Sequence, residues 1–162
     1  REAWGRLALA EFIAPASGRG YLVRRFTPRD VCDHFDLRIL FESRAAELAA
    51  GCCSDQGAPD SAALQGLADS GIEFHTGLAR CCGNTALCQV IETLIEHPIG
   101  HLSQGGESDL EPVRQEHLEV VRLVAEGRGP AAAAAMTRHL ERQRQRIGSC
   151  LGDSPHAEAS VG

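Results

Sequence analysis

The chain has 162 residues, 43% of them hydrophobic, and a formal net charge of −6. This length and apolar content suffice for one domain with a sizeable core, and no apolar run approaches the ~20 residues that cross a bilayer. We therefore expect a cytoplasmic protein with no membrane segment, and the negative charge argues against nucleic-acid binding over the whole surface. All the basic residues are arginine, and a local basic patch occurs among residues 1–29.

The seven cysteines are odd in number, lie mostly within helical patterns and show no C-x-x-C spacing. A disulfide or zinc framework would need a paired, regular arrangement. We interpret them as reduced, small apolar side chains.

The N-terminal 26 residues change their pattern partway along. Residues 1–12 have the apolar spacing of a short helix, and two short apolar runs follow, joined by Ser17-Gly18-Arg19-Gly20 as in a β-hairpin. A helix followed by a two-stranded wing is the second half of a winged helix-turn-helix, whose helix enters the major groove of DNA. Arg19 would then reach the backbone or the minor groove. On the pattern alone, a plain helix–hairpin connection is equally consistent.

A long helix is predicted to begin after Thr27, a suitable N-cap, with Pro28 in its first turn. Arg38 falls on the inner stripe of this helix, and a guanidinium cannot shed its charge when it is buried. Two alternatives stay open for Arg38: it binds an anionic ligand, or it snorkels to the surface or forms an internal salt bridge. The other residues of the stripe are Val31, His34, Phe41, Ala45, Leu48, Ala49 and Cys52.

A loop over residues 51–60 and a helix over residues 62–82 are expected next. His75 shares its face of this helix with apolar residues, so it should point inward. Gly83 then ends the helix and Asn84 caps another one, which continues until Pro98. His97 and His101, near the end of that helix, are expected on the surface, where the helix dipole favours them.

The last two predicted helices place two histidines opposite each other. The turn from Gly127 to Pro130 ends one helix and begins the next, and His117 and His139 both lie roughly 14–15 Å from it along antiparallel helices. Their imidazoles can therefore face each other. One inward histidine is usually a core residue, but three, with His75, at compatible heights favour a site for a divalent metal.

Several stretches of the sequence match known motifs. They are REAWGRL with GRGYLV, DLRILFESRAAELAA, GIEFHTGLARCCGNTAL and EHLEVVRLVAEGRGPAAAAAMTRHLE. The last two resemble the DxxFHxxLxxxxGNxxL and closing EHxxIxxAIxxGDxxxAxxxMxxHL motifs of the FCD ligand-sensing domain. The first two resemble the recognition helix and wing, and the opening FCD helix, of GntR-type transcription regulators of the FadR/VanR branch. The resemblance extends from Arg1 to Ile147.

This resemblance implies an all-α fold, an antiparallel helical bundle preceded by a partial winged helix-turn-helix. The implied domains are residues 1–26 for DNA binding, residues 27–150 for effector binding and dimerisation, and residues 151–162 as a flexible tail. The implied function is that of a homodimeric, ligand-responsive regulator that binds operator DNA and a small carboxylate effector, and that is not an enzyme. The chain is also expected to begin within the DNA-binding domain. The segment between Cys52 and His75 is expected to be shorter than is usual for the family.

The family's metal ligands are one aspartate and three histidines. The histidine positions correspond to His75, His117 and His139, which are implied as ligands of a divalent metal such as zinc or nickel. Gly71 occupies the aspartate position, which is expected to weaken metal binding. The remaining implied roles are effector binding by Arg38 and Asn84, and DNA binding by Arg1, Arg19 and Gly20.

Two other functional classes stay open. A three-histidine metal centre with an open position also occurs in hydrolytic enzymes, but such chemistry usually needs a positioned carboxylate. Glu73 lies about 200° around the helix from His75 and is poorly placed for that role. The third class is a helical bundle that serves dimerisation only, with the histidines as packing residues.

Overall fold

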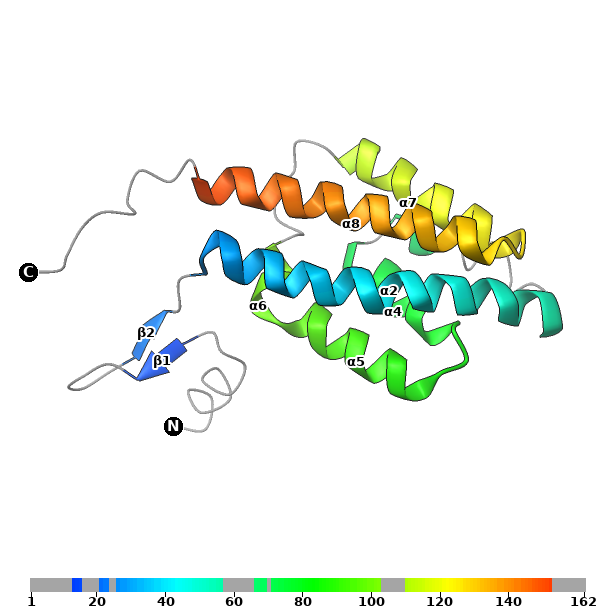
Figure 1. Cartoon of the computed structure of the whole chain (residues 1–162), viewed down its shortest axis with the longest axis horizontal. Coiled ribbons are helices and arrows are strands. Elements are labelled where there is room, and N and C mark those ends of the chain that lie inside the picture. The colour runs from blue at the N-terminus through cyan, green and yellow to red at the C-terminus, as the bar shows by residue number, and fades with distance from the viewer. Residues whose placement is uncertain are drawn as a thin grey trace, which may run out of the picture.

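The computed structural model describes residues 13–15, 21–23, 26–56, 66–69, 71–102 and 110–152. Within them, two short strands precede a bundle of helices, which confirms the all-α prediction for the main body of the chain (Figure 1). Among these described residues, no helix has the length and apolar character that a membrane span requires. The elements are β1 (Ile13–Pro15), β2 (Tyr21–Val23), α2 (Pro28–Gln56), α4 (Gly71–Arg80), α5 (Thr85–Glu96), α6 (Pro98–Leu102), α7 (Leu110–Ala125) and α8 (Gly129–Gly152).

The two strands pair antiparallel, with Ile13 opposite Val23 and Pro15 opposite Tyr21. This pairing agrees with the hairpin that the alternating apolar pattern predicts. The residues predicted to bind DNA, Arg1, Arg19 and Gly20, lie outside the described residues.

Side-chain caps fix where two of the helices begin. Thr27 Oγ1 accepts a hydrogen bond from the Asp30 amide at 3.2 Å, and Asp30 Oδ2 accepts one from the Thr27 amide at 2.7 Å. This reciprocal pair satisfies two amides at the start of α2. At the start of α5, Asn84 Oδ1 accepts from the Leu87 amide at 3.0 Å. Both predicted N-caps are confirmed.

Two glycines end helices at the predicted places. Gly83 and Gly127 have φ of +70° and +69°, a conformation that other residues rarely adopt. After α7, the Arg128 amide donates back to the Leu123 carbonyl at 3.0 Å, which closes the helix end. The chain therefore reverses here, and α7 and α8 run antiparallel (Figure 1).

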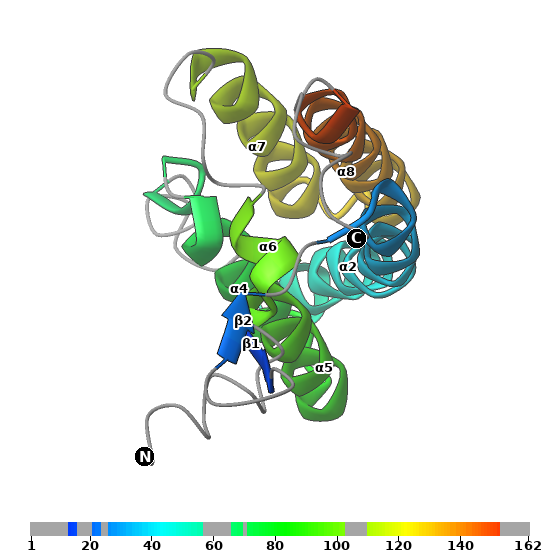
Figure 2. The same ribbon diagram turned by 90° about the vertical axis from the view of Figure 1, so that its left-hand side faces the viewer.

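The longest helices, α2 and α8, also run antiparallel and lie side by side (Figures 1 and 2). Gly129 is needed for their close approach, because a Cβ there would lie 3.0 Å from the Glu47 carbonyl oxygen. The other sides of α2 pack against α4, α5 and α7, so every helix that carries a predicted metal ligand touches it or its partner α8. The buried alanines of the two long helices include Ala45, Ala46, Ala49, Ala132 and Ala135.

Two helix boundaries differ from the prediction. Helix α2 continues through Gly51 to Gln56 instead of ending in a loop; a glycine inside a helix costs only about 1 kcal/mol relative to alanine, which the packing of α2 offsets. The predicted helix over residues 62–82 is interrupted, with a turn at Ala68 and Asp69 before α4 begins at Gly71. At this break the Ala68 carbonyl accepts a hydrogen bond from His117 Nδ1 at 3.2 Å instead of from the backbone of its own helix.

Candidate metal centre

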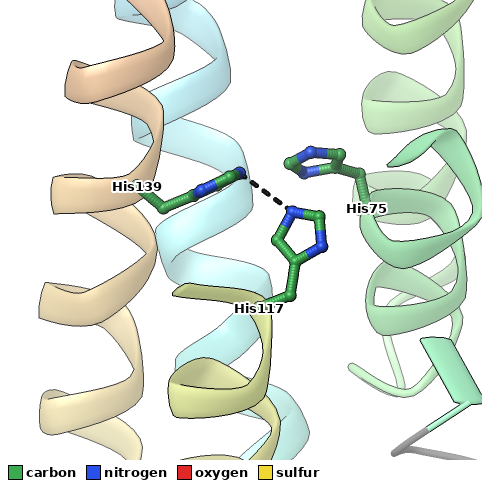
Figure 3. Close-up of side chains that lie close together, drawn as sticks. All are labelled: His75, His117 and His139. Atoms are coloured by element: carbon green, nitrogen blue, oxygen red, sulfur yellow. Dashed lines mark hydrogen bonds between the residues drawn. The ribbon is translucent and has the colours of Figure 1, made fainter. Parts of the chain in front are cut away.

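Three histidines from three helices point toward one another in the interior of the bundle (Figure 3). His75 lies on α4, His117 on α7 and His139 on α8, and none is more than 2% exposed. One ring nitrogen from each lies within 4.8 Å of the others, and no other group of histidine, cysteine or acidic side chains in the described part of the chain meets as closely. The predicted convergence of these side chains is confirmed.

Each histidine uses its Nδ1 atom to bond an oxygen. His75 Nδ1 lies 2.5 Å from Glu42 Oε2, and His139 Nδ1 lies 2.7 Å from Glu116 Oε2, while His117 Nδ1 bonds the Ala68 carbonyl. A carboxylate or carbonyl oxygen only accepts, so each Nδ1 carries the proton and donates it. The three Nε2 atoms therefore present lone pairs, the arrangement that metal-binding histidines adopt when an outer oxygen orients them.

The positions of the Nε2 atoms suit metal coordination better than hydrogen bonding between the rings. His117 Nε2 lies 3.3 Å from His139 Nε2, and His75 Nε2 is buried without a hydrogen-bond partner among the described residues. Two lone pairs at this distance repel unless a proton or a cation lies between them. Two nitrogens bound at about 2.0–2.1 Å in a tetrahedral zinc site lie roughly 3.3 Å apart, which matches the observed separation. The donor set therefore suits zinc or a similar divalent metal.

The electrostatics of the centre keep the imidazoles neutral. Burial is the main cause that lowers the pKa of His75, His117 and His139 to about 4. Phe74 contributes to this apolar setting, because its ring stacks on His117 at a centroid distance of 3.7 Å and meets the edge of His139 at 5.9 Å. A neutral imidazole is the form that binds a metal.

Arg38 is fully buried, and its Nε donates to Glu42 Oε1 at 2.6 Å, which is the internal salt bridge that the sequence left open. Burial alone would raise the pKa of Glu42, but the Arg38 guanidinium and His75 outweigh it and hold that pKa at about 2. Glu42 is therefore ionised, and it links Arg38 on α2 to His75 on α4. This link places Arg38 beside the centre, as the effector-binding alternative also requires.

Two other predicted site residues are exposed, unlike the buried histidines and Arg38. Asn84 is exposed at the turn between α4 and α5, where its side chain caps α5, so the structure does not place it in the buried centre. Gly71 is exposed at the first position of α4, one turn before His75.

Sequence reasoning did not single out Glu42 and Glu116, the two carboxylates that orient His75 and His139. The sequence pattern could have pointed to Glu42, since it lies one helical turn after Arg38 on the same inner stripe. No comparable pattern points to Glu116. It directly precedes His117, and only the pairing of α7 with α8 brings it to His139 and to Arg142, whose Nη1 lies 3.0 Å from Glu116 Oε1.

His97 was expected on the surface, and this prediction is wrong. Its ring is half-buried and stacks on that of His34 at 4.9 Å, because α5 ends against the first turns of α2. The Phe26 ring packs edge-to-face with the same His97 ring, at a centroid distance of 5.7 Å.

We expect Gly71→Asp to tighten metal binding. Positions 71 and 75 are one turn apart on the same face, so an aspartate would add an anionic oxygen next to three neutral ligands. An aspartate in the first turn also suits the helix dipole, so the variant should fold at least as well. Competition with a chromophoric chelator measures the affinity, and Gly66→Asp, at another exposed glycine, is the matched control. Equal affinity in parent and Gly71→Asp would show that position 71 does not reach the metal.

The fold and the centre define an all-helical bundle with a buried three-histidine site. The FCD domain family matches residues 33–142, more than half of the chain. The chain belongs to the FCD domain family.

Solved structures share this fold. A structure described as Streptococcus agalactiae GntR has 24% identity and a TM-score of 0.57, with 90% of this chain and 80% of that chain covered. A transcriptional regulator (GntR family member) from Pseudomonas syringae pv. tomato str. DC3000 has 22% identity and a TM-score of 0.61, with 95% and 71% covered. A search of curated proteins found no match.

Proposed function

We propose that this protein is a ligand-responsive, GntR-type transcription regulator whose helical bundle senses a small carboxylate through a divalent metal held by His75, His117 and His139. The observation that carries the proposal is the common orientation of these residues. Each imidazole is held by an oxygen at Nδ1, which leaves the lone pair of its Nε2 atom available to a metal, and one ring nitrogen from each lies within 4.8 Å of the others. Membership of the FCD family and the resemblance to regulators in fold support the regulatory function.

The charges around the centre favour an anionic ligand. The three imidazoles are neutral, and the opposite charges of Arg38 and Glu42 offset each other within their ion pair. A bound dication would therefore leave the centre with about two positive charges in a buried setting, where a charge is costly until it is compensated. A bound metal would supply a Lewis acid that binds a carboxylate oxygen of the effector.

Arg38 is the residue that we propose to position the effector. Its guanidinium is always charged and presents several N–H donors in one plane, a geometry that suits a carboxylate. It is held in place by Glu42 and by the Phe35 ring, whose centroid lies 5.1 Å from the guanidinium carbon. The effector would therefore meet an oriented cation. Asn84 remains a predicted effector contact from the family resemblance only.

The DNA-binding and dimeric parts of the proposal rest on the family. Strands β1 and β2 form a short antiparallel pair that directly precedes the bundle, as a wing would. Exposed apolar side chains on α2 and α5 are candidates for contact with a second copy of the chain: Leu37, Leu40 and Val90. Arg1, Arg19 and Gly20 remain the proposed DNA-contacting residues.

A hydrolytic enzyme is less well supported. Such a centre needs a general base near the open side of the metal. Among the described residues, Glu42 and Glu116 both bond the Nδ1 sides of their histidines, and Glu73 is exposed on α4. Glu42 and Glu116 are therefore engaged on the side of each ring away from Nε2, and Glu73 is exposed to solvent, so none of the three is placed as a general base.

Isothermal calorimetry with a panel of small carboxylates tests the proposal. Metal-loaded protein should bind at least one acid, the uncharged amide of that acid should bind far more weakly, and chelator-stripped protein should lose the binding. These results follow because the carboxylate would bind the metal directly. Equal binding of an acid to the stripped and the loaded protein would contradict a metal-assisted sensor.

A further inference from the structure

Each of the three histidines is held by an oxygen, but in the described part of the chain these oxygens differ in their access to solvent. Glu42, which holds His75, has a side chain that is 2% exposed, and it pairs with a fully buried guanidinium. The oxygen that holds His117 belongs to an uncharged backbone carbonyl. His139 is different, because its partner Glu116 is 11% exposed and also bonds an arginine at the protein surface.

The Glu116 carboxylate bridges two residues of the neighbouring helix. Its Oε2 atom lies 2.7 Å from His139 Nδ1, and its Oε1 atom accepts a hydrogen bond from Arg142 Nη1 at 3.0 Å. Glu116 lies on α7, whereas positions 139 and 142 are about one turn apart on the same side of α8. Because both oxygens are engaged, the carboxylate cannot turn away from the imidazole without breaking its bond to Arg142.

Arg146 brings a second positive charge to the same carboxylate. Its Nη2 atom lies 3.8 Å from Glu116 Oε2, which is beyond hydrogen-bonding distance but close enough for electrostatic attraction. The side chains of Arg142 and Arg146 are 56% and 38% exposed. Salt screens exposed charges much more than buried ones. The attraction that holds Glu116 is therefore open to screening by solvent ions, while the buried pair at Glu42 is protected from it.

We propose that Arg142, assisted by Arg146, is a positioning residue of the metal centre. It fixes Glu116, and through Glu116 the His139 ring, so that the affinity for the metal depends on ionic strength. This inference rests on the proposed function, because it concerns the same three-histidine site. Outer partners that orient a metal-binding histidine strengthen metal binding. The surface of α8 thus adjusts the metal occupancy of a centre whose own ligands are buried.

Zinc affinity at two ionic strengths tests this proposal. Competition with a chromophoric chelator gives the affinity of the parent and of Arg142→Gln in roughly 0.01 M and roughly 1 M sodium nitrate, where the Debye length is about 30 Å and about 3 Å. At low salt we expect Arg142→Gln to bind zinc roughly two- to fivefold more weakly, as for the loss of an exposed ion pair. At high salt the two proteins should bind zinc alike. Arg142→Lys, which keeps the charge, should recover part of the low-salt affinity.

The matched control is Arg138→Gln. Arg138 pairs with Glu119 across the same two helices at 2.8 Å, and their side chains are 48% and 45% exposed. The Glu119 carboxylate is not among the oxygens that hold the three histidines. This variant should therefore bind zinc as the parent does at both ionic strengths. A loss of affinity equal to that of Arg142→Gln would indicate a general effect of surface charge and would overturn the proposal.

A measurement on the metal-free protein tests the positioning step by itself. Long-range ¹⁵N spectra of imidazoles distinguish a ring protonated at Nδ1 from a ring protonated at Nε2. At neutral pH we expect His139 to be protonated at Nδ1 in the parent and in Arg138→Gln, because Glu116 accepts that proton's hydrogen bond. In Arg142→Gln the Nε2-protonated form should appear as well. A His139 spectrum that is unchanged in Arg142→Gln would rule out the positioning role.

The outcomes separate this inference from the proposed function. If the parent binds zinc and Arg142→Gln binds it equally well at low salt, the inference is overturned and the metal centre stays intact. The same holds if the two proteins differ as much at high salt as at low salt, because a screened charge cannot cause such a difference. If the parent binds no metal, the proposed function fails, and the inference about metal affinity fails with it.

Discussion

Replacing Glu42 with glutamine is expected to destabilise the protein by about 3–5 kcal/mol, because the buried Arg38 guanidinium would lose the charge of its Glu42 partner. The same change removes the carboxylate that orients His75, for which a loss of roughly 10- to 100-fold in metal affinity is typical. Urea unfolding of the metal-free variant measures the first effect, and chelator competition at a temperature where the variant is folded measures the second.

The control for this variant is Glu47→Gln on the same helix. Glu47 pairs with Arg44 at 2.6 Å, but both side chains are partly exposed, and such surface pairs contribute only about 0.2–1 kcal/mol. A Glu42→Gln protein as stable as the Glu47→Gln protein would show that the buried pair does not hold the centre together.

The metal-free protein is expected to lose several kcal/mol of stability as the pH falls from about 6.5 to about 4. The pKa values of His34, His75, His117 and His139 are lowered to about 4, mainly by burial, so the unfolded chain binds protons that the folded chain excludes over this interval. Stability therefore rises with pH there, and it is fully present above the unfolded pKa near 6.5. Each histidine can contribute at most about 3 kcal/mol, and the coupled ones contribute less than their sum.

Glu42 extends the same trend to lower pH. Its folded pKa of about 2 lies below the usual value of 4.5, so its contribution is present above that value and is lost as the pH falls toward 2. Urea unfolding in the presence of chelator at several pH values measures the profile. His139→Gln should flatten it between pH 4 and 6.5, and a parent protein with constant stability over this interval would contradict the buried, neutral histidines.

The helical periods and glycine stops of the sequence were enough to place the three histidines together. His117 and His139 lie at equal distances from the turn at Gly127, and a helix turn fixes such heights through the rise per residue. His75 needed only its position on the apolar face of α4. These are local features, which the order of residues along one or two helices determines.

The partners of the histidines depend on how the helices pack, which no local pattern specifies. Glu42 reaches His75 across 33 residues of sequence, and Glu116 reaches His139 across 23. The carbonyl of Ala68 is available to His117 only because the helix breaks there. The same holds for the stacking of His97 on His34, since it follows from the way α5 ends against α2.

Metal analysis of the protein tests the central claim most directly. The protein should be purified without a chelator or a nickel column, and its metal content should be compared with that of His139→Ala. The proposed centre predicts about one equivalent of zinc, nickel or a similar divalent metal in the parent, lost in the variant, and a rise in unfolding temperature when metal is added to stripped parent. A metal content near zero, with no thermal shift on adding any of these metals, would contradict the three-histidine metal centre.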